Sequence, residues 1–222
     1  MTRRIAVAWP DPRPFDGREG RPIRLLAASD ETDPALDHAA NRDALGAVEL
    51  VIGCGDLAPD RLAFLADAFH ASLVYVRGNH DRGGPWREPR HVPEQTAGAE
   101  SGVVAGLFLL GLPWPGRGDD PARRDAWVAW RQALGAGLSG RLHRGPCLVF
   151  SHAPPAGLGD APADPYHEGF GAYRFLLERL GPPLWLHGHT PLAGRSWQEH
   201  LGATVLVNVT GTVLIELLPP AR

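Results

Sequence analysis

The fold of this chain is indicated most clearly by residues 50–81, which read LVIGCGDLAPDRLAFLADAFHASLVYVRGNHD. One short apolar run, Leu50-Val51-Ile52, leads to Gly53-Cys54-Gly55-Asp56, and a second, Leu73-Val74-Tyr75-Val76, leads to Gly78-Asn79-His80-Asp81. Apolar runs of this length are typical of buried strands, and Gly-containing segments of this kind are typical of turns. The stretch therefore predicts two strands whose ends present Asp and Asn side chains.

The surrounding segments extend this pattern into an alternation of strands and helices. Pro59 opens a predicted helix between the two strands. An earlier strand is predicted at residues 23–28, and a helical pattern follows it at residues 35–46. The order β-α-β-α-β is typical of a parallel sheet covered by helices.

The second half of the chain is richer in loops and pairs of short strands. Val103-Val104 and residues 107–110 are expected to form a hairpin, and residues 204–209 with 213–217 are expected to close the chain as a β pair. Further strands are expected at residues 148–150 and 184–186, and helices at residues 122–136 and 170–180. We interpret residues 1–22, with four prolines between positions 10 and 22, as an irregular N-terminal extension, and residues 23–222 as a single domain.

The charged residues exclude two kinds of chemistry. All 22 basic residues of the 222-residue chain are arginines, so there is no lysine for a Walker-type phosphate loop or for a Schiff base. The 22 arginines and 25 acidic residues give a net charge of −3, which provides no global attraction for a polyanion such as DNA.

The remaining bulk properties are those of an ordinary globular protein. Apolar residues make up 44% of the chain, and the two cysteines, Cys54 and Cys147, do not suggest a disulfide framework. The first apolar stretch is too short for a signal peptide, and no apolar run approaches the ~18 residues of a membrane span. We therefore expect a cytoplasmic protein without membrane contact.

Side chains of metal-ligand type follow five of the expected strands. Because the carboxyl ends of neighbouring strands meet at one edge of a sheet, these side chains are expected to converge. The mixture of carboxylate, amide and imidazole groups suits Zn, Mn, Fe or Ni better than Ca or Mg alone. The predicted ligands are Asp30, Asp56, Asn79, His152, His187 and His189.

Each of these residues has a simpler explanation when it is taken alone. Asp30 is suited to cap a helix, and Asp56 and Asn79 are common turn residues beside glycine. A lone His152 is more often a partly buried histidine with a hydrogen-bond partner. Turn chemistry does not explain why all of them stand at strand ends, and this favours the metal-site interpretation.

The spacing of these motifs closely resembles that of the calcineurin-like metallophosphoesterases, over almost the whole chain. The family pattern runs D-x-H, G-D, G-N-H-D/E, a lone His, and G-H-x-H or a related H-G-H. The corresponding segments here are Asp30-Glu31-Thr32, Gly55-Asp56, Gly78-Asn79-His80-Asp81, Ser151-His152 and His187-Gly188-His189. The resemblance implies an α/β fold of four layers, α-β-β-α, in which two mixed β-sheets pack as a sandwich with flanking helices.

The resemblance also implies a site for two divalent metal ions (Mn, Zn, Fe or Ni). Asp56 would bridge the ions, Asn79, His152 and His187 would hold one, and Asp30 with His189 would hold the other. Two ions at such a site activate a water molecule and neutralise charge on the phosphoryl group.

The residues His80 and Asp81 of the same motif are predicted to be catalytic. His80 is placed to protonate the leaving oxygen or to stabilise the transition state, and Asp81 to orient the His80 ring.

One departure from the pattern concerns the first motif. Thr32 stands where the family has a histidine, so the ion at Asp30 and His189 lacks a nitrogen ligand. The alternatives are that this ion is bound weakly, that water takes the place of the histidine, or that Asp33 or Asp37 does; a site with one ion instead of two is also open.

The resemblance and the predicted ligands lead us to expect a metallophosphoesterase that hydrolyses a small phosphate mono- or diester by attack of a metal-bound hydroxide. The short chain favours a small soluble substrate, and His167 is a candidate substrate contact. A scaffold or regulatory protein on the same fold, with little or no activity, and a nuclease are the alternatives; the net charge disfavours nucleic acid. The oligomeric state is left open.

Overall fold

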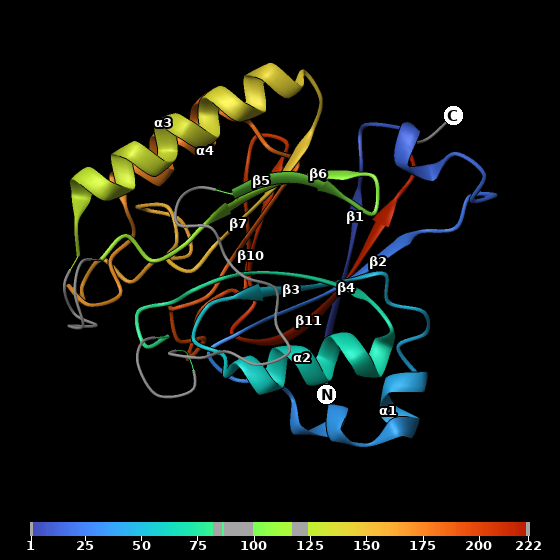
Figure 1. Ribbon diagram of the computed structural model, residues 1–222. Coiled ribbons are helices and arrows are strands. Elements are labelled where there is room, and N and C mark those ends of the chain that lie inside the picture. Colours follow the sequence, from blue (N-terminus) through green and yellow to red (C-terminus); the bar gives the residue numbers. More distant parts are fainter. Residues whose placement is uncertain (1, 82–85, 87–99, 117–123, 221–222) are drawn as a thin grey trace.

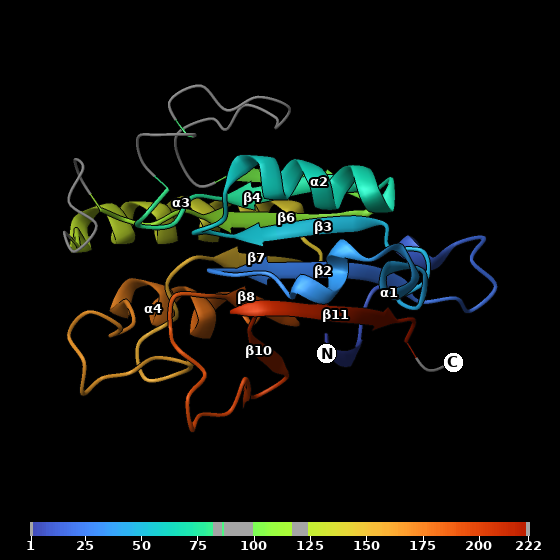
Figure 2. The same cartoon turned by 90° about the horizontal axis from the view of Figure 1, so that it is seen from below.

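The computed structural model describes residues 2–81, 86, 100–116 and 124–220. Two sheets lie face to face, and helices cover the outer side of each sheet (Figure 1). The same layers are seen from below in Figure 2. This arrangement confirms the predicted fold class, a four-layer α-β-β-α sandwich built on two mixed β-sheets.

The first sheet has five strands in the order β1-β11-β2-β3-β4. Strands β2, β3 and β4 are parallel to one another, whereas β11 is antiparallel to β2. The carboxyl ends of β2, β3 and β4 therefore lie at one edge of the sheet. The strands span β1 Arg3–Ala8, β2 Ile23–Ser29, β3 Leu50–Cys54, β4 Ser72–Val76 and β11 Gly211–Leu218.

The second sheet has six strands in the order β5-β6-β7-β8-β10-β9. Strands β5 and β6 form the expected hairpin, and β6, β7, β8 and β10 are parallel. The ends of β7 and β8 thus also share an edge. The strands span β5 Glu100–Val104, β6 Leu107–Leu112, β7 Cys147–Ser151, β8 Leu184–His187, β9 Gln198–Leu201 and β10 Thr204–Asn208.

The main core lies between the two sheets. Leu25 and Ile52 of the first sheet and Phe150 and Leu186 of the second belong to one buried apolar cluster. Leu26, which points to the opposite face from Leu25, belongs instead to a cluster with residues of the helical layer. Strands buried on both faces in this way have the continuous apolar runs seen in the sequence.

Helices α1 and α2 cover the five-stranded sheet, and α3 and α4 cover the six-stranded sheet (Figure 1). None of the described helices has the length and apolar character that a membrane-spanning segment needs. The α-helices span α1 Ala39–Asp43, α2 Pro59–Phe69, α3 Ala126–His143 and α4 Gly171–Leu180, and two 3₁₀ helices span Arg13–Phe15 and Pro34–Asp37.

The interpretation of residues 1–22 as an irregular extension is wrong for Arg3–Ala8. These residues form β1, which pairs in parallel with β11 at the edge of the first sheet. Trp9 and Phe15, which follow β1, are buried in the core between the sheets. The pairing partner lies about 200 residues away in the chain, so the local sequence gives no sign of it.

Two other expected elements differ in the structure. The helix expected at residues 35–46 is interrupted at His38, whose extended backbone separates Pro34–Asp37 from α1. Because α1 buries no side chain, packing does not hold the segment as one continuous helix. The strands expected to close the chain as a pair, β10 and β11, lie in different sheets.

The third expected helix is also shifted. The sequence predicts it at residues 122–136, whereas in the structure it spans Ala126–His143. Residues 122 and 123 lie outside the described part of the chain.

Candidate metal centre

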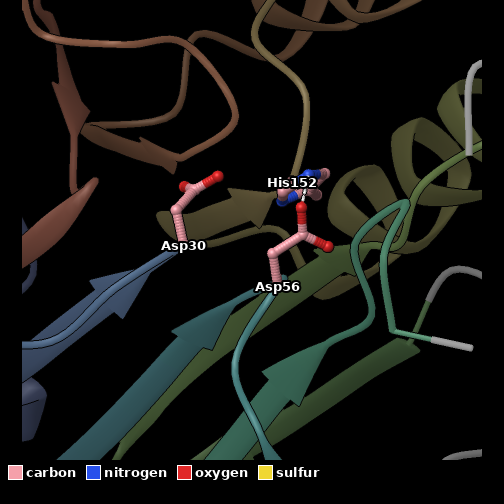
Figure 3. A group of neighbouring side chains, drawn as sticks. All are labelled: Asp30, Asp56 and His152. Carbon is pink, nitrogen blue, oxygen red and sulfur yellow. Dashed lines mark ion pairs between the residues drawn. The ribbon is translucent and has the colours of Figure 1, made fainter.

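Three predicted ligands converge where the ends of the two sheets meet. Asp30 follows β2, Asp56 lies two residues beyond β3, and His152 follows β7. The three side chains point toward one another (Figure 3), and their ligand atoms all lie within 4.8 Å of one another. Among the described residues, this is the group of acidic, histidine and cysteine side chains with the geometry to hold a metal ion.

His152 is surrounded by oxygen atoms on both sides of its ring. Its Nδ1 lies 2.8 Å from the carbonyl oxygen of Cys54, and its Nε2 lies 2.7 Å from Oδ1 of Asn79. Nε2 is also 3.3 Å from Oδ2 of Asp56. Burial alone would lower the pKa of His152, but the hydrogen bond and charge of Asp56 raise it to about 9. Nε2 therefore faces the oxygen atoms of Asn79 and Asp56, with which it would share a bound cation.

The Asp56 carboxylate is held in its charged form. Burial opposes ionisation, but the hydrogen bond and charge of His152 outweigh it and lower the pKa of Asp56 below its usual value. Its Oδ1 accepts a hydrogen bond of 2.8 Å from the backbone N–H of His80. An ionised carboxylate in this position is suited to bind a divalent cation.

Asp81 makes contacts that the sequence does not predict. Its Oδ2 accepts hydrogen bonds from the backbone N–H groups of Asp56, at 2.7 Å, and of Gly78, at 2.8 Å. Asp81 thus ties the two loops that carry Asp56 and Asn79, and its orienting of the His80 ring stays a prediction. Burial, with a further contribution from the charge of Asp56, raises the pKa of Asp81 to about 6.

The backbone of the centre is strained at three predicted ligands. The φ angles of these residues lie in the left-handed region that residues other than glycine rarely adopt. They are 62° for Asp30, 55° for Asp56 and 66° for His189. Such conformations persist only where surrounding contacts hold them, and they occur often at functional sites. Here Oδ2 of Asp30 accepts from the N–H of His189 at 3.0 Å and from Thr210 Oγ1 at 3.1 Å.

Glycine is required at two positions of the motifs because neighbouring side chains lie too close for a Cβ atom. A Cβ atom at Gly78 would lie 2.1 Å from Oδ1 of Asp56, and one at Gly188 would lie 1.8 Å from Oγ of Ser29. Ser29 Oγ in turn donates to the carbonyl oxygens that end β3. The glycines of G-N-H-D and H-G-H therefore bring the strand ends close enough to form the centre.

The other two predicted histidine ligands are buried but fall outside the three-residue group. The ring of His189 lies 4.9 Å from that of His152, and its Nε2 donates to the carbonyl oxygen of Tyr166. His187 donates from Nδ1 to the carbonyl of Gly188, and its Nε2 faces Gly159. Burial lowers the pKa of His187 to about 4 and that of His189 to about 3, so both are neutral, the form that binds metal.

Sequence reasoning missed Tyr166. Its hydroxyl accepts a hydrogen bond of 2.6 Å from Nδ2 of Asn79 and lies 3.0 Å from Nε2 of His80. His80 is exposed, and this contact joins it to the ligand-bearing loop. The one signal in the sequence is the neighbouring His167, the candidate substrate contact.

His167 and Thr32 make contacts with different neighbours. The His167 ring lies 5.0 Å from that of His189 and its Nδ1 is hydrogen-bonded to Asp164. Thr32 Oγ1 accepts a hydrogen bond of 2.7 Å from Nε of Arg61, which also pairs with Asp37. The hydroxyl of Thr32 is thus engaged with α2, and Asp37 is engaged with the same arginine.

The donor set of the centre fits a divalent transition metal. Asp30, Asp56 and His152 supply two carboxylates and an imidazole, and Asn79 adds an amide oxygen beside His152. Hard cations such as Ca²⁺ favour oxygen ligands alone, whereas Mn, Fe, Ni and Zn accept imidazole as well. The assignment of individual residues to one ion or two remains a prediction.

Comparison with known proteins agrees with this geometry. Residues 30–193 match the sequence pattern of the family described as calcineurin-like phosphoesterase. No curated protein sequence matches the chain significantly.

Several solved structures are similar to the chain. The protein TT1561 of Thermus thermophilus has a TM-score of 0.56 at 18% identity, covering 86% of this chain and 90% of that one. A dimetal phosphatase from Danio rerio has a TM-score of 0.56 at 14% identity, covering 86% and 88%. GAP50, described as the anchor in the inner membrane complex of Plasmodium, has a TM-score of 0.52 at 11% identity, covering 86% and 72%. At these identities the similarity concerns the fold.

Proposed function

This chain belongs to the calcineurin-like phosphoesterase family, and on that premise we propose that it is a metal-dependent hydrolase of small phosphate mono- or diesters. The observation that carries the proposal is the convergence of Asp30, Asp56 and His152 within 4.8 Å at the meeting point of the two sheets. Four polar groups, including the adjacent Asn79, would be costly to gather there without a ligand to bind.

The chain would hold one or two divalent ions at this centre. Asp56, Asn79 and His152 are proposed to bind one ion, with His187 as the further ligand if its ring turns from Gly159. Asp30 and His189 are proposed to bind the other. When bound, such ions supply positive charge to the phosphoryl oxygens and lower the pKa of a coordinated water.

His80 is the proposed proton donor to the leaving oxygen. It is exposed beside the centre, and its backbone N–H is fixed by Asp56. Its Nε2 lies 3.0 Å from the hydroxyl of Tyr166, which also bonds Asn79. Tyr166 therefore keeps the His80 ring at a fixed place relative to the ligands, which is what general acid catalysis requires.

The nature of the substrate is inferred from the charges available. With no lysine in the chain, phosphate charge must be met by metal ions, imidazole, backbone N–H groups and arginine. A net charge of −3 gives little attraction for a long polyanion. A small phosphoester is therefore favoured over nucleic acid, and His167, beside His189, is the proposed substrate contact.

A scaffold with little or no activity is the second candidate, and one observation favours it. Thr32 replaces the family histidine, and its hydroxyl is engaged by Arg61 instead of facing Asp30 as a ligand. An ion at Asp30 and His189 would then be held weakly, and the centre would generate its nucleophile less well.

Hydrolysis assays separate the two candidates. Purified protein is tested with p-nitrophenyl phosphate and bis-p-nitrophenyl phosphate in the presence of Mn, Zn, Fe, Ni or Mg ions. We expect turnover that depends on a transition metal and is lost in Asp56→Asn. Asp67→Asn, which changes an exposed carboxylate on α2, serves as the matched control and keeps wild-type turnover. Absence of turnover with every metal, or turnover unchanged in Asp56→Asn, would reject the enzyme.

A further inference from the structure

The outer face of α3 is apolar along most of its length. The helix lies on the outside of the six-stranded sheet beside α4 (Figure 1). Five of the seven large apolar side chains that are exposed in the described part of the chain belong to this helix. These five, which we call the α3 stripe, are Trp127 (64% exposed), Trp130 (41%), Leu134 (58%), Leu138 (61%) and Leu142 (72%).

Most of the α3 stripe has a spacing that is the same whether the helix is followed from its N-terminus or from its C-terminus. Trp130, Leu134, Leu138 and Leu142 recur every four residues and form one ridge along the helix. A second, antiparallel copy of this ridge can therefore be placed against the first by a two-fold rotation, with the axis between Leu134 and Leu138. Self-complementarity of this kind is what a two-fold interface between identical chains requires.

A groove runs beside the ridge on the same face. Helices α3 and α4 form an open groove of about 370 Å³ that is lined by Leu134, Leu138 and Phe175 and, among charged residues, by Arg141 and Arg179. The ridge of one copy thus has a groove to enter on the other. This relief distinguishes the face from one suited to a lipid surface, for which an apolar stripe without a matching groove is sufficient.

Gly135 lies on this exposed face in the interior of α3. A Cβ atom there would meet nothing within 4 Å, so no contact inside the chain requires glycine. Glycine weakens a helix relative to alanine, and it is used where another backbone approaches closely. Gly135 therefore leaves room on this face for the backbone of a second helix.

The area of the stripe also fits a second copy. At about 150–250 Å² for a large side chain, the exposed fractions of the five residues amount to roughly 600 Å². A standard interface buries about 800 Å² per partner, and the half-buried Phe175 and Leu180 of α4 add to the same face. Arg141 and Arg179 also line the groove, so in the dimer their aliphatic stems pack against the ridge while their charged groups stay at the rim in contact with water.

We propose that the α3 stripe is the contact of a two-fold homodimer, in which α3 packs antiparallel against α3 of a second copy of this chain. The groove between α3 and α4 of each copy receives the ridge of the other. Leu134 of one copy contacts Leu138 of the other. The inference is independent of the activity proposed above.

Sedimentation equilibrium of the full chain between about 1 and 100 µM tests the proposal. The wild type is expected to form a dimer. Leu138→Glu is expected to raise the dissociation constant of the dimer on the order of a hundredfold, because the substitution places two glutamates in one apolar contact. Leu218→Glu changes an exposed leucine of β11 on the other sheet, and it is expected to dimerise as the wild type does. A wild type that stays a single chain at 100 µM overturns the proposal.

Two further measurements test whether the two α3 helices are antiparallel and whether a membrane, instead of a second copy of the chain, covers the α3 stripe. A mixture of Leu134→Cys and Leu138→Cys chains is expected to form mixed disulfides faster than either chain forms its own; the native thiols are buried and do not compete. Preference for same-residue disulfides overturns the antiparallel arrangement. A monomeric wild type that co-sediments with vesicles containing phosphatidylserine, and loses this binding in Leu138→Glu, overturns the homodimer in favour of a membrane surface.

Discussion

Replacing Asp81 by asparagine should change how the stability of the metal-free protein depends on pH. Asp81 is 4% exposed, and burial raises its pKa from the ordinary 3.8 to about 6, with the charge of Asp56 adding to the effect. A carboxyl group with a higher pKa in the folded than in the unfolded chain binds its proton more tightly when folded. Its contribution to stability is therefore complete below pH 3.8 and is lost as the pH rises through 6.

The magnitude follows from the size of the pKa shift. At about 1.36 kcal/mol per pH unit, the full loss is about 3 kcal/mol, of which about 2 kcal/mol falls between pH 4 and pH 7. The amide introduced by Asp81→Asn retains an oxygen that can accept from Gly78 and Asp56 but does not titrate. The free energy of unfolding of the variant, minus that of the wild type, should thus rise by about 2 kcal/mol over this interval.

Urea unfolding at pH 4, 5, 6 and 7 in the presence of a chelator measures this difference. Asp67→Asn, which removes one exposed carboxylate from α2, corrects for the change in net charge. A difference that stays flat or falls with rising pH would refute the reasoning. It would mean that the two backbone hydrogen bonds to Asp81 outweigh the effect of burial on its pKa.

Three other substitutions test separate parts of the centre. Tyr166→Phe removes the hydroxyl between Asn79 and His80 and should lower kcat about fivefold with little change in KM, measured by steady-state kinetics; an unchanged kcat counts against the positioning role. Thr32→His should increase the content of bound transition metal measured by elemental analysis, and an unchanged content would show that this position is not a lost ligand site. Gly78→Ala should lower the free energy of unfolding by about 1–3 kcal/mol because its Cβ would overlap Asp56, whereas Gly171→Ala, where a Cβ meets nothing within 4 Å, should not.

The strands that carry the candidate ligands could be predicted because their signals are local. Residues 50–52 and 73–76 lie within β3 and β4, each an apolar run followed by a glycine turn. The ends of parallel strands share an edge, so the convergence of Asp30 and Asp56 followed from strand order alone. The helix between these two strands, α2, also begins at Pro59 as the sequence predicts.

Features that depend on distant partners could not be predicted in this way. Strand β1 is held by β11 from the other end of the chain, and its sequence has no turn or motif to mark it. Tyr166 reaches Asn79 from 87 residues away, through a loop without regular structure. The role of Asp81 depends on the backbone N–H groups of two loops, which a sequence motif does not describe.

The pairing of the last two strands also could not be predicted from the sequence. Strands β10 and β11 are adjacent in sequence but belong to different sheets. The apolar pattern of each segment identifies it as a strand. The same pattern is expected whether two consecutive strands pair with each other or lie in different sheets. Only the packing of the two sheets decides between them.

Asp56 and His152 are proposed to belong to a divalent metal centre. Equilibrium dialysis against Mn²⁺ at about pH 7.5 measures whether these residues bind the ion. We predict that the wild type and His200→Gln, an exposed histidine of β9, bind one or two ions per chain, and that Asp56→Asn and His152→Gln bind with at least about tenfold lower affinity. Equal binding by all four proteins would contradict the account.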